Sequence, residues 1–329
     1  SRGRRRSCKH VPWLLRPLPS PYQAVYQRNT SPLKSGDTRV IKMDMEFMHR
    51  LPKILGNADP MHYTQLLPGI QTNAEYDAGL HIQGCDNSHN IISIGGIPVY
   101  NASHLLGFFS TFIPSHFSSM SITKNATADR GYSCIGGILD MEPYDSIPQK
   151  TNGEFSVGLM SSQGTARIPL GWKAALFTSV RLSYLNLLYS PLLKIDDGQL
   201  NYSFGDINAT YLQKIGNNHT LHIDIYSGID NAEIKDPTSK LYFNTQTSWG
   251  NALGAVHWKY KFNKGTLKQS IYFSGYGNKL RLTGDYHVKL PSDIYDIGYR
   301  SNITLRNIEA GISIINHNTT PQAPEYSNS

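Results

Sequence analysis

The sequence predicts a mainly β protein, in which a small α+β region precedes part of an antiparallel transmembrane β-barrel. From about residue 153, apolar and polar residues alternate over long segments, and a period of two is the signature of a strand. These segments run ~10 residues or more, whereas ordinary strands have about 5–6. Their Trp, Tyr and Phe residues gather towards the segment ends, which is typical of the aromatic girdles of membrane barrels.

The composition agrees with strands that have one wet face. Of 329 residues, 39% are apolar and 17% charged, and the charged share is low beside the ~25% of soluble domains. No apolar run approaches the ~18–20 residues of a membrane-spanning helix. The sequence therefore argues against a helical membrane protein, whereas alternating barrel strands escape a hydropathy scan.

The net charge of +7 comes from the first 39 residues, which hold nine basic groups, one acid and several prolines. We expect residues 1–39 to form a disordered leader or linker. We also expect the true N-terminus to be missing, because no signal peptide is readable and the chain does not begin with Met. Since the rest of the chain is nearly neutral, nucleic-acid binding is not expected.

Residues 40–150 predict a small α+β region. Apolar spacing predicts a helix over Glu46–Leu55, and Asp59-Pro60 resembles an N-cap followed by Pro at the first helical position. Pro68-Gly69 then ends this second helix. Short apolar stretches between glycines predict a small mixed sheet, with one or two helical turns at 105–112; the stretches are 79–83, 90–94, 120–123 and 138–141.

Residues 151–329 are predicted to form the barrel part, with roughly nine strands between 153 and 318. In the segment 172–184, Trp172 and Val180 share the apolar face, and Arg181 lies on the other. The alternation changes phase between 267–273 and Leu280, so we predict a bulge or hairpin turn at Gly275–Asn278. Lys259, Asp285 and His287 are expected, with Arg181, to point inward; the alternatives are binding to an enclosed domain or facing water.

Four motifs resemble the plug of TonB-dependent outer-membrane receptors. Leu66–Gln71 (LLPGIQ) is similar to the family's LLPGVQ, and Gly95–Ser110 (GGIPVYNASHLLGFFS) to its DGVPVYNPSHLFGFFS. Ser119–Lys124 matches a strand ending in Lys, and Ile138–Met141 (ILDM) matches the closing VLDI. The resemblance spans about residues 40–320. The plug motif proper is carried by Gly95, Gly96, Pro98, Val99, Gly107, Phe108 and Phe109.

This resemblance implies a plug (residues 40–150) inside a 22-stranded barrel in the outer membrane, of which residues 151–329 supply the N-terminal part. It also implies energised import of a scarce ligand, driven by the TonB complex. The ligand classes left open are siderophore, cobalamin, oligosaccharide and peptide. About nine strands cannot close such a barrel, and open edges in lipid are costly. We therefore expect a truncated, divergent receptor, and hypothesise a remnant or gene fragment that does not function as it stands.

The chain departs from the family pattern at Gly84-Cys85-Asp86, where a double glycine is usual. It departs again at Gly95, which stands where the family commonly has an Asp before GVPVYN. No TonB box is visible. Within the resemblance, Tyr100, Asn101 and His104 lie on a plug loop that could face the ligand. The alternative left open is that Tyr100 and His104 pack the plug against the barrel wall.

Catalysis, a metal site and a cofactor are not expected, because the histidines are scattered and no zinc or nucleophile motif is present. Cys85 and Cys134 could pair or remain thiols. The alternative function is a secreted all-β glycan- or protein-binding module. The orientation of four side chains distinguishes these two hypotheses. In a barrel they would be exposed on the outward face, whereas in a sandwich they would be buried in a shared core. They are Trp172, Val180, Leu282 and Tyr286.

Overall fold

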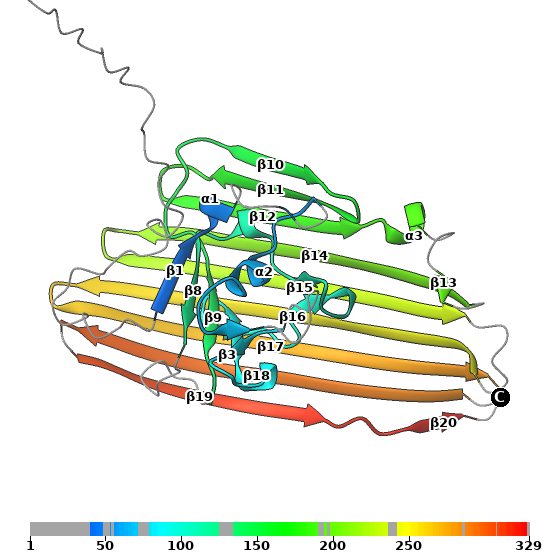
Figure 1. The fold of residues 1–329 in the computed structure, drawn as a ribbon. Coiled ribbons are helices and arrows are strands. Elements are labelled where there is room, and N and C mark those ends of the chain that lie inside the picture. The colour runs from blue at the N-terminus through cyan, green and yellow to red at the C-terminus, as the bar shows by residue number, and fades with distance from the viewer. Residues whose placement is uncertain are drawn as a thin grey trace, which may run out of the picture.

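The computed structural model describes residues 40–48, 53, 56–71, 79–124, 134–189, 194–195, 198–235, 242–284, 287–306 and 308–327. The predicted leader at 1–39 lies outside these residues. A large curved sheet, the wall, carries a small α+β unit, the plug, on one face (Figure 1). Among the described residues, no helix is long and apolar enough to cross a membrane.

The plug is built on a five-stranded sheet in the order β1-β8-β9-β4-β5. The pair β4–β9 is parallel and the other pairs are antiparallel, so the sheet is mixed, as the sequence predicts. Two further pairs, β2–β3 and β6–β7, are short hairpin ladders. The plug strands are β1 Val40–Asp44, β2 Ile70–Gln71, β3 His81–Ile82, β4 Ile91–Ile94, β5 Ile97–Pro98, β6 Ser103–His104, β7 Phe109–Ser110, β8 Ser119–Thr123 and β9 Ile138–Glu142.

The helices of the plug are short. The helix α2 begins at Pro60 and ends at Thr64, and the side chain of Asp59 accepts hydrogen bonds from the amides of Met61 and His62, so the predicted N-cap is confirmed. The first predicted helix, Glu46–Leu55, begins as α1 (Met45–Met48), and most of its remaining residues lie outside the described ones. The remaining elements of this kind are the 3₁₀ turns η1 Asn87–His89, η2 Leu105–Gly107 and η3 Pro114–His116.

The wall consists of nine long or medium strands joined in sequence order, which confirms the predicted number within the described residues. Every pair is antiparallel, and β13 and β20 pair beside this path. The strands are β10 Asn152–Val157, β11 Ser161–Pro169, β12 Ala174–Ser183, β13 Lys194–Ile195, β14 Gly198–Ile215, β15 His219–Lys235, β16 Tyr242–Phe262, β17 Gly265–Gly284, β18 His287–Leu305, β19 Ile308–Thr320 and β20 Glu325–Ser327; the helix α3 spans Leu185–Tyr189.

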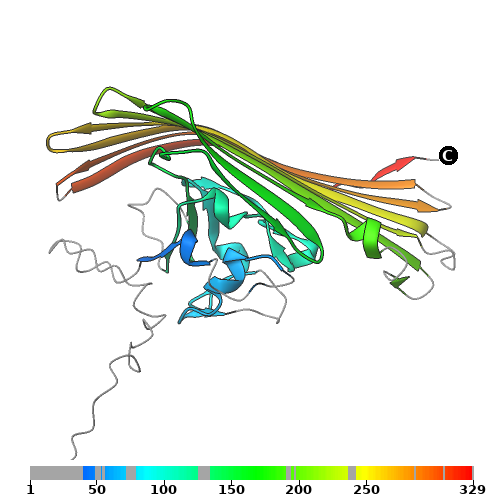
Figure 2. The same cartoon turned by 90° about the horizontal axis from the view of Figure 1, so that it is seen from above.

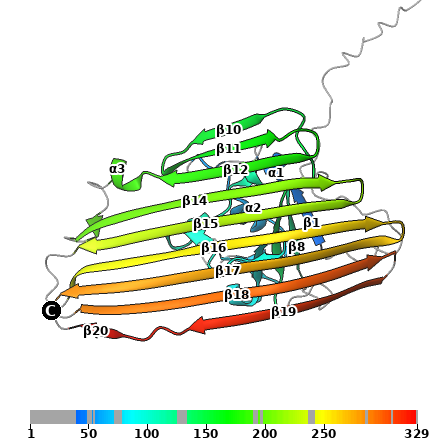
Figure 3. The same cartoon turned by 180° about the vertical axis from the view of Figure 1, so that it is seen from behind.

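The two ends of the wall differ in the spacing of consecutive strands. At one end, two or three residues separate β14 from β15, β16 from β17 and β18 from β19; at the other end the sequence gaps from β12 to β14 and from β15 to β16 are longer, and that from β17 to β18 is two residues. We call these the short-turn end and the long-loop end. Viewed from above, the plug lies against one face of the curved wall, and no element of the described residues covers the opposite face (Figures 2 and 3).

The core lies between the plug sheet and the wall. It combines plug residues such as Ile94, Met120 and Leu139 with wall residues such as Tyr226 and Tyr272, all nearly inaccessible to solvent. Burying these side chains from both units removes apolar area from water, which is the main force that holds the plug in place.

The outward face of the wall is apolar where it faces away from the plug. Trp172 is 81% exposed and Val180 is 41% exposed, so both point outward, as the barrel predicts and the sandwich does not. Tyr286 lies outside the described residues. Other exposed aliphatic side chains continue this belt: Ile207, Ile225, Ile229, Val256, Ile271 and Ile297.

The predicted bulge or hairpin turn at Gly275–Asn278 is wrong. The strand β17 runs unbroken from Gly265 to Gly284, with continuous pairing to both neighbours through these residues. The alternation of inward and outward positions along β17 therefore continues without a break, but the apolar residues pass from the outward face to the inward face. Towards the long-loop end, Lys279 and Arg281 take outward positions and Leu282 an inward one, so the predicted outward facing of Leu282 is also wrong.

Candidate functional site

The plug motif opens with a tight hairpin between β4 and β5. Ile94 pairs with Ile97, and the two residues between them, Gly95 and Gly96, both have positive φ (59° and 88°). A two-residue hairpin turn of this kind needs left-handed backbone at both positions, which glycine adopts without a steric penalty. The amide of Gly96 donates to the carboxylate of Asp140 at 2.7 Å, so the turn is also held to β9.

The segment after this turn is attached to the wall at three points. Arg300 donates to the carbonyl of Gly96. Ser274 donates to the carbonyl of Pro98 at 2.5 Å, and the Tyr100 hydroxyl donates to Asp296 at 2.5 Å. Burial and the neighbouring Asp296 carboxylate raise the pKa of Tyr100 well above its ordinary value, so Tyr100 remains a neutral donor.

The next motif residue, Asn101, has a positive φ of 43°, which asparagine tolerates better than most side chains. Its amide donates to the Tyr276 hydroxyl at 3.2 Å, and its carbonyl accepts from Asn251 at 3.3 Å. Ser103 donates to the side-chain oxygen of Asn101 at 3.1 Å. The loop tip is therefore oriented by the wall strands β16 and β17.

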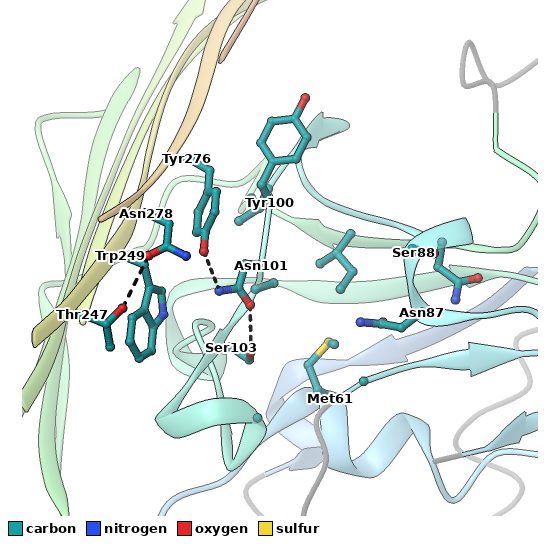
Figure 4. Close-up of a pocket in the computed structure, with 16 residues that line it drawn as sticks. Met61, Asn87, Ser88, Tyr100, Asn101, Ser103, Thr247, Trp249, Tyr276 and Asn278 are labelled. Carbon is teal, nitrogen blue, oxygen red and sulfur yellow. Dashed lines mark hydrogen bonds between the residues drawn. The ribbon is translucent and has the colours of Figure 1, made fainter. Parts of the chain in front are cut away.

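A cavity of about 610 Å³ lies between this loop tip and the wall (Figure 4). It falls within the about 300–1,000 Å³ of typical small-ligand sites. The loop side brings Tyr100 and Asn101 into the lining, and the wall side brings Trp249, Tyr276 and Asn278. The other lining residues are Met61, Gly79, Asn87, Ser88, Asn90, Ile92, Val99, Ala102, Ser103, Gly107 and Thr247.

His104 lies outside this cavity, in a buried cluster of charges between plug and wall. The residue is fully buried, with Nδ1 2.7 Å from Asp230 and Nε2 2.9 Å from both carboxylate oxygens of Asp206. Its ring stacks on Phe204 with centroids 4.6 Å apart. This geometry favours the plug–wall packing role, so we do not propose His104 as a ligand residue.

Arg181 completes the cluster from the wall. Its guanidinium contacts Asp206 at 2.6 Å and donates to the carbonyl of Ser110 on the plug at 2.7 Å. Two cations and two carboxylates thus meet where water is excluded, and such a set persists only when every member is paired. We call His104, Arg181, Asp206 and Asp230 the buried ionic cluster.

Tyr202 extends this cluster to the next motif residue. Its hydroxyl donates to Asp230 and accepts from the amide of Leu105 at 2.5 Å. Leu105 has a positive φ of 49°, which is unfavourable for a leucine. The bond from Tyr202 therefore stabilises a strained backbone at the start of η2.

The buried plug histidines His104 and His116 differ in charge. Burial alone would lower the pKa of His104, but Asp206 and then Asp230 outweigh burial and the opposing effect of Arg181, so the pKa is raised above 6.5. For His116, burial and the nearby Arg167 lower the pKa to about 3. His104 is therefore the charged member of the pair near neutral pH.

The contact between plug and wall should consequently weaken in alkaline solution. Because the folded-state pKa of His104 is raised, its contribution to stability is complete below the unfolded value of about 6.5 and is lost as the pH rises through the folded value. In the full-length protein, the protection of the Leu105–Ser110 amides against hydrogen exchange, taken relative to the intrinsic exchange rate at each pH, should fall over that range. A His104→Gln variant should not show this titration; an identical titration in the variant would contradict the assignment.

Most of the other motif residues are buried or half-buried. Val99, Gly107 and Phe109 are buried, Pro98 is half-buried and Phe108 is 38% exposed. Of the predicted inward groups, Lys259 reaches Asp145 at 2.5 Å, whereas His287 takes an outward position opposite Thr283. Asp285 lies outside the described residues. Cys85 and Cys134 are free thiols, and the described residues contain no cluster suited to a metal ion.

Several site residues on the wall were not singled out from the sequence. They are Asp206, Asp230, Trp249, Tyr276, Asp296 and Arg300. The sequence contained one signal for some of them. In two strands an acid lies next to an aliphatic residue that occupies the other face: Asp206 beside Ile207, and Asp296 beside Ile297. An acid on the face opposite a lipid-facing residue points towards the lumen, although its partner cannot be read from the strand.

Comparison with solved structures identifies the fold. The ferric enterobactin receptor of Pseudomonas aeruginosa matches with a TM-score of 0.54 and 10% identity, over 89% of this chain and 59% of that chain. The ferric preacinetobactin receptor BauA of Acinetobacter baumannii matches with a TM-score of 0.56 and 12% identity, over 89% and 50%. The chain has the fold of a TonB-dependent outer-membrane receptor.

The outer membrane transporter YddB of Escherichia coli adds a third match, with a TM-score of 0.53, 8% identity, and coverage of 88% of this chain and 55% of that chain. The chain thus spans between half and three-fifths of the length of these receptors. No protein-family model matches the sequence, and no curated protein matches it. The structures that it resembles are transport receptors and not enzymes.

Proposed function

We propose that this chain supplies the plug (residues 40–150) and the first part of the barrel (residues 151–329) of a TonB-dependent outer-membrane receptor. The receptor would import a scarce small molecule across the outer membrane, with energy transduced by the TonB complex. The observation that carries the proposal is the belt of exposed aliphatic side chains on the outward face of a wall whose inward face holds charged, plug-binding residues. A soluble protein rarely exposes so large an apolar surface.

The two ends of the wall fit this placement. Near the short-turn end, His219, Trp258 and Tyr260 stack with nearly parallel rings, 4.5–6.2 Å between centroids. Aromatic residues of this kind favour the membrane interface. Near the long-loop end, the outward face becomes polar, with Asn231, Lys279 and Arg281. A lipid layer between these two levels explains the distribution, with the long loops outside the cell.

The outward exposure of these apolar side chains does not favour the alternative of a secreted all-β binding module. In a sandwich, a second sheet would cover the apolar face of the wall. Among the described residues, no element covers that face, and the plug packs on the opposite one (Figure 2). The ligand itself would be received at the cavity between Asn101 and Trp249, for which Tyr100 and Asn101 are the proposed plug residues.

Membrane fractionation of cells that express the full-length protein tests this proposal. We expect the protein in the outer-membrane fraction, with the long-loop end accessible to protease added outside intact cells. Uptake of the ligand should require TonB. Soluble material that is released without detergent would overturn the proposal, whatever ligand the protein binds.

A charge placed in the aliphatic belt provides a second test. Ile225 and Asn231 lie on the same outward face of β15, the first within the belt and the second near the long-loop end. Ile225→Arg should destabilise the full-length protein by about 2 kcal/mol, because the guanidinium must leave water for lipid. Asn231→Arg, the matched control, should change stability by less than about 1 kcal/mol. Reversible urea unfolding from lipid vesicles measures both, and equal effects would contradict a lipid-facing belt.

A further inference from the structure

Among the described residues, no charged side chain lines the cavity between plug and wall. Its sixteen lining residues are aromatic, amide-bearing, hydroxyl-bearing, aliphatic or glycine, and none is Asp, Glu, Lys, Arg or His. This is unusual for its surroundings, because charged residues such as Arg181, Asp230 and Asp296 point inward elsewhere on the same wall. A ligand with a net charge would find no counter-ion here and would lose its hydration without compensation.

One polar group in the lining has no partner. The indole Nε1–H of Trp249 makes no hydrogen bond among the described residues, although the residue is only 8% exposed. Its ring is held by Tyr202, with centroids 6.1 Å apart. Buried donors are nearly always satisfied, so this N–H points to an acceptor that the described residues do not provide.

Amide groups provide further donors nearby. The side-chain oxygen of Asn87 accepts from the Leu80 amide at 3.0 Å, and that of Asn278 is 3.5 Å from the Thr247 hydroxyl. The bonds found among the described residues use these two oxygens and leave the two NH₂ groups to a ligand. Figure 4 shows Trp249, Tyr276 and Asn278 on one side of the cavity, opposite Asn101 and Asn87.

We infer that this cavity binds an uncharged saccharide, an inference that rests on the proposed receptor function and names its ligand class. Sugar hydroxyls and ring oxygens accept from the Trp249 indole and the asparagine amides. The C–H face of a pyranose ring packs against the ring of Tyr276, which is amphipathic in the same way. The volume of about 610 Å³ accommodates a short oligosaccharide.

Binding of defined trisaccharides to the full-length receptor in lipid nanodiscs tests this inference. The probes are neutral trisaccharides of glucose, mannose, galactose and N-acetylglucosamine, with ferric citrate and a trialanine peptide as competitors of other classes. Isothermal titration calorimetry should detect saturable binding of at least one trisaccharide. Trp249→Phe keeps the ring and removes the donor, so it should weaken that binding about tenfold.

Two further variants make the result decisive. Asn278→Ala should also weaken saccharide binding several-fold, and Trp258→Phe, on the outward face, should leave it unchanged. The inference is overturned if no trisaccharide binds, or if Trp249→Phe and Asn278→Ala bind it as well as the unaltered receptor. Tight binding of ferric citrate instead would overturn the saccharide and leave the receptor function standing. A protein that never reaches the outer membrane would refute that function separately.

Discussion

Asp206→Ala should destabilise the full-length protein by about 3–5 kcal/mol, because it removes one partner of a buried ion pair and leaves the other charge uncompensated. Asp206 accepts from Arg181 at 2.8 Å, from His104 at 2.9 Å and from the Tyr226 hydroxyl at 3.2 Å. After the substitution, Arg181 keeps only its bond to the Ser110 carbonyl among those found here. Urea unfolding, followed by tryptophan fluorescence, measures the change.

A paired replacement distinguishes lost charge balance from lost packing. Arg181→Met combined with Asp206→Leu removes both charges and restores apolar volume, so most of the lost stability should return. The two single variants and the double variant form a mutant cycle whose coupling energy reports the pair. Either of two outcomes would show that the buried ionic cluster does not stabilise the plug. One is that Asp206→Ala costs less than about 1 kcal/mol; the other is that the double variant loses as much stability as the two single variants together.

Asp59→Ala should cost about 3 kcal/mol. One carboxylate oxygen caps α2 by accepting from the Met61 amide at 2.9 Å, and the other accepts from the Ser110 amide at 2.6 Å. Losing a cap costs about 1 kcal/mol, and a buried amide deprived of a charged acceptor adds about 2 kcal/mol. Because the Ser110 carbonyl also accepts a hydrogen bond from Arg181, the substitution should weaken both α2 and the plug–wall contact.

An exposed cap on the same plug provides the control. Asp86 caps η1 through the Ser88 amide at 3.0 Å but lies at the surface, so Asp86→Ala should cost far less stability than Asp59→Ala. The pH dependence adds a second readout. Burial raises the pKa of Asp59, but His62 and Ser110 outweigh it and lower the pKa below 3.8. Its contribution is therefore present above pH 3.8 and lost as the pH falls through the folded value. Equal losses in both variants would contradict the coupling assigned to Asp59.

Local patterns predicted the elements of this protein well. The N-cap at Asp59, the mixed plug sheet and the number of wall strands all follow from signals within a few residues of each other. The Gly95-Gly96 turn was not predicted, although its signal is also local, because left-handed backbone at both positions selects glycine. Such features depend on dihedral preferences and on the periodicity of burial, which neighbouring residues already express.

The error at Gly275–Asn278 shows where periodicity misleads. A change in the phase of the hydrophobic pattern indicates either a break in the backbone or a change of environment along an unbroken strand. In β17 it is the second: the outward face passes from Ile271 and Phe273 to Lys279 and Arg281 with continuous pairing. Alternation records which face is apolar, whereas the solvent on each side depends on the position along the strand.

His104 marks the boundary between the two kinds of information. Its place in a plug motif was readable from residues 95–110, as were the alternating faces of the strands that carry Asp206 and Asp230. That its ring lies between these two carboxylates, 102 and 126 residues away in the chain, follows from docking the plug on the wall. A local pattern reflects the preferences of a segment, but an ion pair or a shared cavity depends on the register and packing of segments that are distant in sequence.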